Sequence, residues 1–382
     1  MPQPAGFVGV TANLGLKEGA DDFAVVAAPS GPVTSAAVFT RSRFAGASVL
    51  LSRSSDLAAF RGVVTISKNA NVATGPTGEA NALEVRRLAA DIVGVRPEEL
   101  LVASTGVIGV QYPMDVLTPA LEKLAGTAGE ADFEAAAAAI MTTDTIAKIE
   151  TRTVGGATIV GIAKGVGMLE PDMATMLTYF FTDAEVSAAD LDAAFRRVVD
   201  RTYNAVSIDT DTSTSDTAAI FASGAAGAVD LAEFEAALYD AALALVKKIA
   251  SDGEGASKLI TVSVGGARDD AQAKRVGKAI VNSPLVKTAV HGADPNWGRV
   301  AMAIGKLREE TDISPEHVRI AFGGTETYPA QVSANLLADL STYLSGDEVS
   351  IEVDLGIAEG EFTVYGCDLT DGYIRINADY TT

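Results

Sequence analysis

A threonine that follows a small residue near the middle of the chain is the first candidate for chemistry. Residues 164–177 read KGVGMLEPDMATML, in which Ala174 precedes Thr175. A threonine hydroxyl is a weak nucleophile unless a base lies beside it, and a chain with only two histidines offers little for a Ser-His-Asp arrangement. Attack of Thr175 on the preceding carbonyl would form an ester, and hydrolysis of that ester would cut the chain.

The cut would free an α-amine, which supplies the base that the hydroxyl lacks. The pKa of an α-amine is about 7.7–8.0 in model peptides, so a useful fraction is unprotonated near neutral pH and can accept the hydroxyl proton. The glycine- and proline-containing approach also suits a strained scissile turn. The segment therefore predicts self-cleavage between Ala174 and Thr175, followed by catalysis by an N-terminal threonine.

A second candidate lies where a predicted strand ends. Residues 105–109 read TGVIG and directly follow the strand expected at residues 100–104. Backbone N–H groups in such a turn can point into a site and stabilise an oxyanion. Thr105 and Gly106 are therefore candidates for an oxyanion hole, although turns of this kind also occur without any catalytic role.

The acidic run at residues 209–216, DTDTSTSD, allows two further interpretations. An EF-hand loop needs glycine at its sixth position and glutamate at its twelfth, where this chain has Thr214 and Ile220, so calcium is disfavoured. A strand followed by D-x-D also resembles the aspartyl nucleophile loop of haloacid-dehalogenase-type phosphatases. That alternative would make Asp209 the nucleophile, but the sequence supplies nothing else of such a site.

Several other polar positions keep two interpretations each. Asn69 and Asn71 follow a predicted strand and either frame a pocket or satisfy a turn. Glu254 lies between two glycines, and the residues alone favour a solvated turn over a carboxylate held against a ligand. His291 invites a general-base role, but with so few histidines and no cysteine nearby a structural role is favoured.

The elements that must position these residues alternate between strands and helices, which predicts an α/β protein. Two strands flanking a Pro-Ser-Gly-Pro turn, residues 23–28 and 33–40, are expected to pair as a hairpin. A length of 382 residues exceeds one ordinary core, so two domains are expected. Further strands are predicted at residues 63–67, 100–104, 157–163, 177–181, 205–208, 259–264, 349–355, 361–368 and 373–377, and helices at 79–93, 131–141, 187–199, 230–250 and 270–281.

The net charge and the composition exclude several classes of binding partner. The formal net charge of −21 would repel a phosphate backbone, so a nucleic-acid partner is not expected. The single cysteine, Cys367, excludes an internal disulfide and a thiolate metal cluster, and it is expected to be a small buried hydrophobe in a strand. The N-terminus lacks a signal-peptide pattern and no apolar run approaches a membrane span. We expect a cytoplasmic protein with no metal, no cofactor and no membrane partner.

Several motifs together resemble one known family. The self-cleavage segment KGVGMLEPDMATML closely resembles that of the ornithine acetyltransferase (glutamate N-acetyltransferase) family, in which the cut falls between the Ala and Thr of MATML. With Glu170-Pro171-Asp172 before the cut, the chain looks closer to the paralogue associated with clavulanic acid gene clusters than to the arginine-pathway enzymes. The resemblance spans nearly the whole chain through ASTGVIG at 103–109, MTTDT at 141–145, DTDTSTSDT at 209–217, SDGEGASK at 251–258, NSPLVKTA and DPNWGRVAMAIGK beyond residue 282, and CDLTDGYIRINADYTT at the end.

The resemblance implies a reaction and a set of site residues. It implies ping-pong transfer of acetyl from N2-acetyl-L-ornithine to L-glutamate through an acetyl-threonine, with Thr175 as nucleophile and with Thr105 and Gly106 as the oxyanion hole. A substrate with an α-carboxylate and a δ-ammonium needs both a cation and an anion in its site. The implied substrate contacts are Thr142, Lys164, Thr175, Glu254, Asn377 and Thr382.

The resemblance also implies a fold and an assembly. The fold is an αββα-type layered sandwich of the aminopeptidase and ornithine acetyltransferase superfamily over residues 1–280, with a smaller C-terminal α+β domain over 281–382. The mature protein would be an α fragment, 1–174, and a β fragment, 175–382, assembled as α2β2 without a cofactor. Two alternatives remain: a self-processing N-terminal-nucleophile amidase or aminopeptidase, in which water replaces glutamate, and a metabolite-binding protein that never cleaves.

Overall fold

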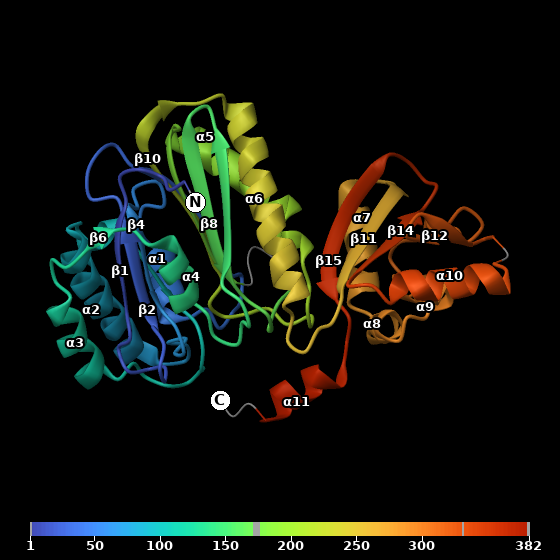
Figure 1. The fold of residues 1–382 in the computed structure, drawn as a ribbon, viewed down its shortest axis with the longest axis horizontal. Coiled ribbons are helices and arrows are strands. Elements are labelled where there is room, and N and C mark those ends of the chain that lie inside the picture. Colours follow the sequence, from blue (N-terminus) through green and yellow to red (C-terminus); the bar gives the residue numbers. More distant parts are fainter. Residues whose placement is uncertain (1, 171–175, 331, 380–382) are drawn as a thin grey trace.

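The computed structural model describes residues 2–170, 176–330 and 332–379, and within them it contains three five-stranded sheets (Figure 1). The first sheet has the order β5 (Leu100–Ser104), β4 (Gly62–Ile66), β2 (Phe23–Ala27), β1 (Val8–Ala12) and β6 (Gly129–Glu130). The second has the order β3 (Thr34–Phe39), β10 (Thr217–Ala228), β9 (Leu177–Glu185), β8 (Ala157–Lys164) and β7 (Lys148–Val154). The third has the order β13 (Thr325–Tyr328), β12 (Arg319–Phe322), β14 (Glu348–Asp354), β11 (Leu259–Ala267) and β15 (Gly360–Cys367).

Helices cover the outer face of the first sheet. They are α2 (Gly75–Val93) and α3 (Met114–Lys123), and an apolar cluster of α2, α3, β2, β4 and β5 side chains fills the space between these helices and the sheet. Helix α1 (Ala47–Arg53) instead lies against the edge strand β5, where the Ser52 hydroxyl donates to the Val102 carbonyl and accepts from the Val102 N–H. The predicted end of α2 is confirmed, because Gly94 adopts a left-handed conformation with φ 74° and its N–H bonds to the Ala90 carbonyl. Such a conformation is strained for most other residues, so this glycine defines the stop.

The second sheet carries its own outer helices, α5 (Ala188–Arg201) and α6 (Leu231–Ser251). Both begin at predicted caps, since the Ser187 side chain accepts a hydrogen bond from the Asp190 N–H and the Asp230 side chain accepts one from Glu233. Their apolar faces pack on β8, β9 and β10 in one core cluster. The long buried strands read as nearly continuous apolar runs because helices cover one face and the first sheet covers the other.

The two sheets pack face to face and complete a four-layer αββα sandwich (Figure 1). Side chains of β2, β4 and β5 meet those of β3, β8, β9 and β10 in a shared core, to which α4 (Phe133–Ala139) contributes Phe133. The ring centroids of Phe133 and Phe181 lie 4.9 Å apart, and those of Phe181 and Phe221 lie 5.5 Å apart in a stacked pair. Aromatic pairs at such separations add packing energy beyond the area that they bury. The layered fold expected from the resemblance is thus present.

The third sheet builds a separate core with α7 (Asp270–Val281), α8 (Pro284–His291), α9 (Trp297–Gly305) and α10 (Ala334–Leu344). Its central strand β11 pairs with both β14 and β15, and its helix α7 packs on the same sheet. Residues 259–280 thus lie with the C-terminal elements. We therefore propose that the C-terminal unit begins before Leu259 and not at residue 281, where the sequence placed it. In Figure 1 this unit stands beside α6, and α11 (Asp371–Asp379) extends from it back beneath the sandwich.

Three local predictions are wrong, because the structure of these segments depends on packing between parts of the chain that are distant in sequence. The expected hairpin does not form: β2 pairs with β1 and β4, whereas β3 pairs with β10, so the turn crosses from one sheet to the other. The apolar run 205–208 is buried but forms the end of a short 3-10 helix, η2 (Tyr203–Ala205), and a single bridge from Val206 to Tyr365. Residues 373–377 lie in helix α11, where Ile374 is 65% exposed. With no buried face to fill, that segment satisfies its backbone groups within the helix.

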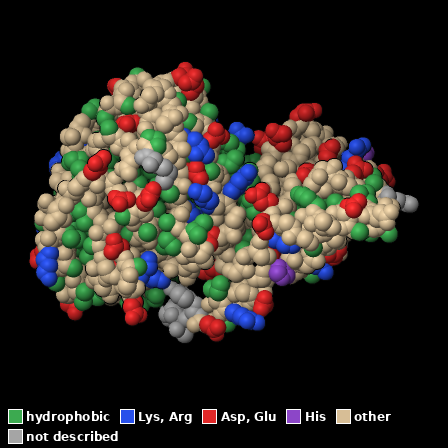
Figure 2. Space-filling view, viewed as in Figure 1, with side chains coloured by type: hydrophobic (Ala, Val, Ile, Leu, Met, Phe, Trp, Pro, Cys, Tyr) green, Lys and Arg blue, Asp and Glu red, His purple; other side chains and the backbone are tan. Residues whose placement is uncertain are grey.

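Other local predictions are confirmed. The strands at 63–67, 100–104, 157–163, 259–264 and 361–368 are present, and so is the buried position of Cys367. The part of the chain that the structure describes contains no helix long and apolar enough to cross a membrane. Figure 2 shows acidic side chains distributed over both lobes of the visible face, in keeping with the strong negative charge. The remaining short element is the 3-10 helix η1 (Pro97–Glu99).

Candidate active site

The ends of strands from both sandwiched sheets converge where the sequence placed the chemistry. Thr105 follows β5, Lys164 ends β8, and Leu177 begins β9. Leu177 is paired with Lys164 on one side and with Thr217 on the other, and the Thr217 N–H donates to the Met176 carbonyl at 2.9 Å. The predicted nucleophile Thr175, two positions before Leu177 in the sequence, and the predicted cut after Ala174 lie outside the described residues.

The structure brings two predicted residues from different sheets into direct contact. The Lys164 ammonium donates to the Thr105 hydroxyl, with 3.0 Å between Nζ and Oγ1. Since Oγ1 accepts from the ammonium, its own hydrogen is free to be donated elsewhere. Asp216 is buried near this pair, and within the described part of the chain its Oδ2 has no hydrogen-bond partner. Burial raises the pKa of Asp216 well above its usual range, despite the nearby Lys164 charge.

The turn after β5 differs from the expected pair of backbone donors. The Thr105 N–H is already bonded to the Ile66 carbonyl at 3.0 Å, so Thr105 can contribute to an oxyanion hole only through its hydroxyl. Gly106 has φ 131°, and a Cβ there would lie 2.2 Å from the Lys68 carbonyl carbon. Only glycine fits this close approach. Among the described residues, no acceptor is bonded to the Gly106 N–H.

Glu254 is held by neighbours, contrary to the solvated turn that the residues alone favoured. Its Oε1 accepts from the Thr143 hydroxyl at 3.0 Å, its Oε2 accepts from Asn377 Nδ2 at 2.9 Å, and its N–H donates to the Val166 carbonyl. A Cβ at Gly167 would lie 2.5 Å from Glu254 Oε2, so the glycine leaves room for the carboxylate. Two predicted substrate contacts, Glu254 and Asn377, are thereby joined, whereas Thr382 lies outside the described residues.

Thr142 is fixed through its backbone. Its N–H donates to Asp144 Oδ2 at 3.1 Å, and its carbonyl accepts from Lys68 Nζ at 2.9 Å. Sequence reasoning missed the roles of Lys68, Thr143 and Asp144. Lys68 could have been noticed because it follows a predicted strand in the same loop as Asn69, and the other two because they lie within the MTTDT motif beside Thr142.

The remaining polar candidates have structural partners. Asn71 is buried and bonds to the Gly78 carbonyl and the Thr74 hydroxyl, which supports the turn interpretation. The Asp209 carboxylate accepts the N–H groups of Met168 and Leu169 at 2.7 and 2.8 Å. An aspartate committed to two backbone amides anchors a loop and is poorly suited to act as a phosphatase nucleophile.

Two other side chains that could have been reactive also have structural surroundings. His291 lies on the C-terminal unit with its Nδ1 2.9 Å from Asp368 Oδ2, in keeping with the favoured structural role. Burial raises the pKa of the Cys367 thiol to about 11, which keeps it protonated and unreactive near neutral pH. Neither residue is joined to Thr105 or Lys164 by a contact in the described part of the chain.

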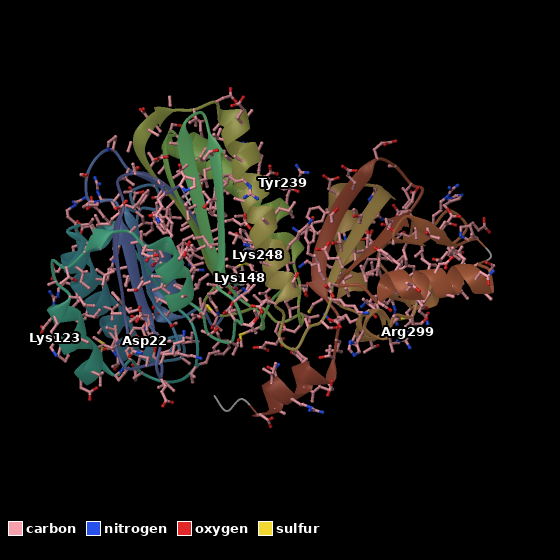
Figure 3. The ribbon with its side chains drawn as sticks, viewed as in Figure 1. Asp22, Lys123, Lys148, Tyr239, Lys248 and Arg299 are labelled. Atoms are coloured by element: carbon pink, nitrogen blue, oxygen red, sulfur yellow. The ribbon has the colours of Figure 1, made fainter. Side chains whose placement is uncertain are left out.

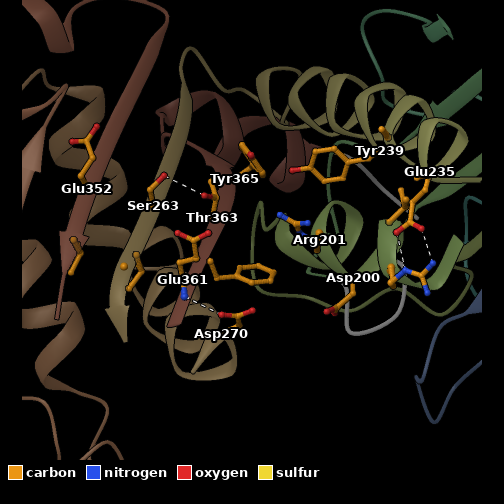
Figure 4. Close-up of a pocket in the computed structure, with 18 residues that line it drawn as sticks. Asp200, Arg201, Glu235, Tyr239, Ser263, Asp270, Glu352, Glu361, Thr363 and Tyr365 are labelled. Atoms are coloured by element: carbon orange, nitrogen blue, oxygen red, sulfur yellow. Dashed lines mark hydrogen bonds and ion pairs between the residues drawn. The ribbon is translucent and has the colours of Figure 1, made fainter. Parts of the chain in front are cut away.

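One cleft of the described structure does not coincide with these residues. A cleft of about 1130 Å³ lies between α5 and α6 on one side and β11 and β15 on the other, and Figure 4 shows Arg201, Tyr239 and Glu361 on its walls. None of the predicted site residues lines it. A smaller cavity of about 210 Å³ is lined by Glu254, Asp209 and Tyr373 among others. The candidate site is therefore identified by the position of its residues at the strand ends and not by the volume of a cavity.

Comparisons with known proteins identify the family of this chain. The model of the ArgJ family matches residues 9–382. A protein named glutamate N-acetyltransferase Oat2 from Streptomyces clavuligerus is 62% identical over 99% of this chain and 98% of its own length. The arginine biosynthesis bifunctional protein ArgJ of Rhodococcoides fascians is 56% identical over 99% of this chain and 94% of its own length. A solved ArgJ structure from Bacillus halodurans is 41% identical, covers 52% of this chain and 96% of its own chain, and has a TM-score of 0.49.

The fold, the site and these relatives define an enzyme of mixed α/β architecture in the acyltransferase class. The chain belongs to the ArgJ family. The family resemblance drawn from the motifs is therefore confirmed, and the variant form named with it agrees with the relative from Streptomyces clavuligerus.

Proposed function

We propose that this chain transfers acetyl from N2-acetyl-L-ornithine to L-glutamate through an acetyl ester on Thr175. The observation that carries the proposal is the contact between the Lys164 ammonium and the Thr105 hydroxyl beside the paired start of β9. It supports the proposal because it gives a polarised donor at Lys164, the residue that pairs with Leu177, which follows Thr175 by two positions in the sequence. The Glu254 carboxylate, which accepts hydrogen bonds from Thr143 and Asn377, adds an anion for the cationic side chain of the substrate.

The proposed chemistry has two half-reactions. In the first, Thr175 Oγ attacks the acetyl carbonyl carbon while the α-amine of Thr175 accepts the hydroxyl proton. The resulting oxyanion accepts hydrogen bonds from the Thr105 hydroxyl and the Gly106 N–H. Its collapse breaks the C–N bond, and the α-ammonium returns the proton to the leaving nitrogen of ornithine. In the second half-reaction the α-amine of glutamate attacks the ester and regenerates the free threonine.

Charge complementarity supports the choice of substrates. Ornithine carries an α-carboxylate and a δ-ammonium, and the proposed contacts offer a cation at Lys164 and an anion at Glu254. We assign Thr142, Asn377 and Thr382 to the same substrate contacts. The names of the relatives refer to arginine biosynthesis, and we place this chain in the same amino-acid chemistry.

We also propose the maturation and the assembly. Self-cleavage would give fragments 1–174 and 175–382. Strand β9 of the second fragment is paired with β8 of the first and β10 of its own fragment, which would hold the fragments together after the cut. We further propose that two copies of each fragment assemble as α2β2 and that the protein is cytoplasmic.

Acetyl transfer can be tested with donor labelled in the acetyl group. We expect the label to move from N2-acetylornithine to glutamate, with parallel-line initial-rate kinetics and little free acetate. Release of labelled acetate at the same rate with and without glutamate would indicate the amidase alternative. If neither acetylglutamate nor acetate is formed, the result would indicate a metabolite-binding protein and would refute the proposal.

The pH dependence of substrate binding follows from Lys164. Burial lowers the pKa of Lys164 below 10.5, assisted by the Lys148 charge and opposed by the carboxylates of Asp144, Asp216 and Glu254. The lysine is charged below its folded pKa, so binding of a carboxylate is lost as pH rises through that lowered value. We expect the KM for N2-acetylornithine to rise on the alkaline side at a lower pH than that at which a free lysine titrates. Steady-state kinetics against pH should show this limb, and Lys164→Arg should move it to higher pH; an unchanged limb would contradict the assignment.

A further inference from the structure

A fully buried lysine lies between two carboxylates beneath the site. The Lys148 side chain has no exposed area; its Nζ lies 2.7 Å from Asp144 Oδ1 and 2.6 Å from Asp252 Oδ2. Lys148 begins β7 and is paired with Ala163 of β8. Figure 3 shows Lys148 near the lower end of the second sheet, close to α6. The proposed reaction assigns no step to this ion cluster.

Each carboxylate of the cluster holds a segment that carries a proposed substrate contact. Asp144 accepts the N–H of Thr142 at 3.1 Å and the N–H of Gly165, next to Lys164, at 2.8 Å. Asp252 caps the end of α6, two residues before Glu254. Lys148 therefore connects the segments of Thr142, Lys164 and Glu254 through one atom.

The same cluster also ties the end of the Thr142 segment to α6. Asp252 accepts the Thr145 N–H at 3.1 Å and is bonded to the Thr145 hydroxyl. Burial alone would raise the pKa of Asp144, but the Lys164 and Lys148 charges outweigh burial and lower it. Both neighbouring ammonium groups thus favour the ionised carboxylate that accepts the Gly165 amide.

Stability alone does not explain a buried cluster of this kind. A buried ion pair can often be replaced by apolar groups without loss of stability, because desolvation offsets the attraction between the charges. A cluster of fixed charges does, however, define distances between the backbone segments that it joins, because each hydrogen bond tolerates little change in length. The three segments here come from β8, from the loop before β7 and from the end of α6.

We infer that Lys148 is a positioning residue that sets the separation of Lys164 and Glu254 and so matches the site to the side-chain length of ornithine. This inference rests on the proposed function. Lys148 contacts no substrate in this scheme and acts through Asp144 and Asp252. Loosening the cluster lets the cation and anion of the site move apart. A displacement of about 1 Å in such a site can lower the reaction rate roughly 100-fold.

The test compares ornithine with lysine, which has one more methylene. Calorimetric binding of both amino acids is measured for the wild type, for Lys148→Met and for Asp252→Asn. The wild type should prefer ornithine. Both variants should bind ornithine roughly 10- to 100-fold more weakly, which corresponds to about 1.4–2.8 kcal/mol, and lose most of the preference over lysine.

A matched control removes another buried cation. Arg86 of α2 is 6% exposed and donates to the Glu98 carbonyl in the outer layer of the sandwich, so Arg86→Met should lower stability without altering the ornithine preference. Wild-type affinity and preference in both cluster variants would overturn the inference, as would an equal loss of preference in Arg86→Met. If Lys148→Met does not fold, Asp252→Asn decides, since it keeps the shape of the cluster. Failure of acetyl transfer by the wild type is a separate result, which refutes the proposed function and is seen without any variant.

Discussion

Replacing Thr175 with alanine is expected to give a single uncut chain of 382 residues without transferase activity. The substitution removes the hydroxyl that would attack the Ala174 carbonyl, so the peptide cannot become an ester and the α-amine that serves as base is never freed. Denaturing mass spectrometry of the purified protein should show two fragments for the wild type, with Thr175 at the new N-terminus, and one intact mass for Thr175→Ala.

Thr175→Ser is the matched control for this experiment. It keeps a hydroxyl on the same carbon and loses only a methyl group, so the cut and measurable acetyl transfer should remain. Self-cleavage of Thr175→Ala at the same bond would contradict the mechanism. An intact wild-type chain that is fully active would do the same.

Thr105→Val is expected to lower kcat by roughly 100- to 1000-fold, which corresponds to about 2.7–4 kcal/mol in the barrier. Valine keeps the shape of threonine but removes the hydroxyl that accepts from Lys164 at 3.0 Å and whose hydrogen is available to an oxyanion. Because the Thr105 N–H is bonded to Ile66, the backbone cannot take over that role. The KM for N2-acetylornithine should change much less than kcat.

Single-turnover formation of the acetyl-enzyme, measured on self-cleaved protein, isolates the affected step. Thr105→Ser should restore most of the rate, since it keeps the donor in the same place. A kcat for Thr105→Val within about threefold of wild type would show that Thr105 stabilises no oxyanion. A slow Thr105→Ser would indicate a packing effect of the lost methyl group.

The sequence predicted helix ends correctly, because the residues that cap a helix lie close together in the chain. The caps at Ser187 and Asp230 and the left-handed stop at Gly94 lie where the residue types placed them, because capping involves residues only a few positions apart. The wrong predictions fall on segments whose secondary structure depends on residues distant in the sequence. The segment at 373–377 alternates like a strand, yet no sheet edge receives it and it forms helix α11.

Strand pairing shows the same limit. Residues 23–28 and 33–40 are both strands, as predicted, but their partners are β1 and β4 for one and β10 for the other. A Pro-Ser-Gly-Pro turn between two apolar runs is consistent with a hairpin and equally with a crossing between two packed sheets. Burial of both strands on both faces selects the crossing, and burial is a property of the whole fold.

The sequence by itself determined the chemistry available to this protein: a threonine after a small residue, a second threonine beside a glycine, one lysine and one glutamate in glycine-rich turns, and the family to which these motifs belong. Only the tertiary structure decided that Lys164 meets the Thr105 hydroxyl, that Glu254 is held by Thr143 and Asn377, and that Lys148 lies between Asp144 and Asp252. The physical reason is that these contacts join residues from different strands and turns, up to 123 positions apart, and their distances are set by how the sheets and helices pack.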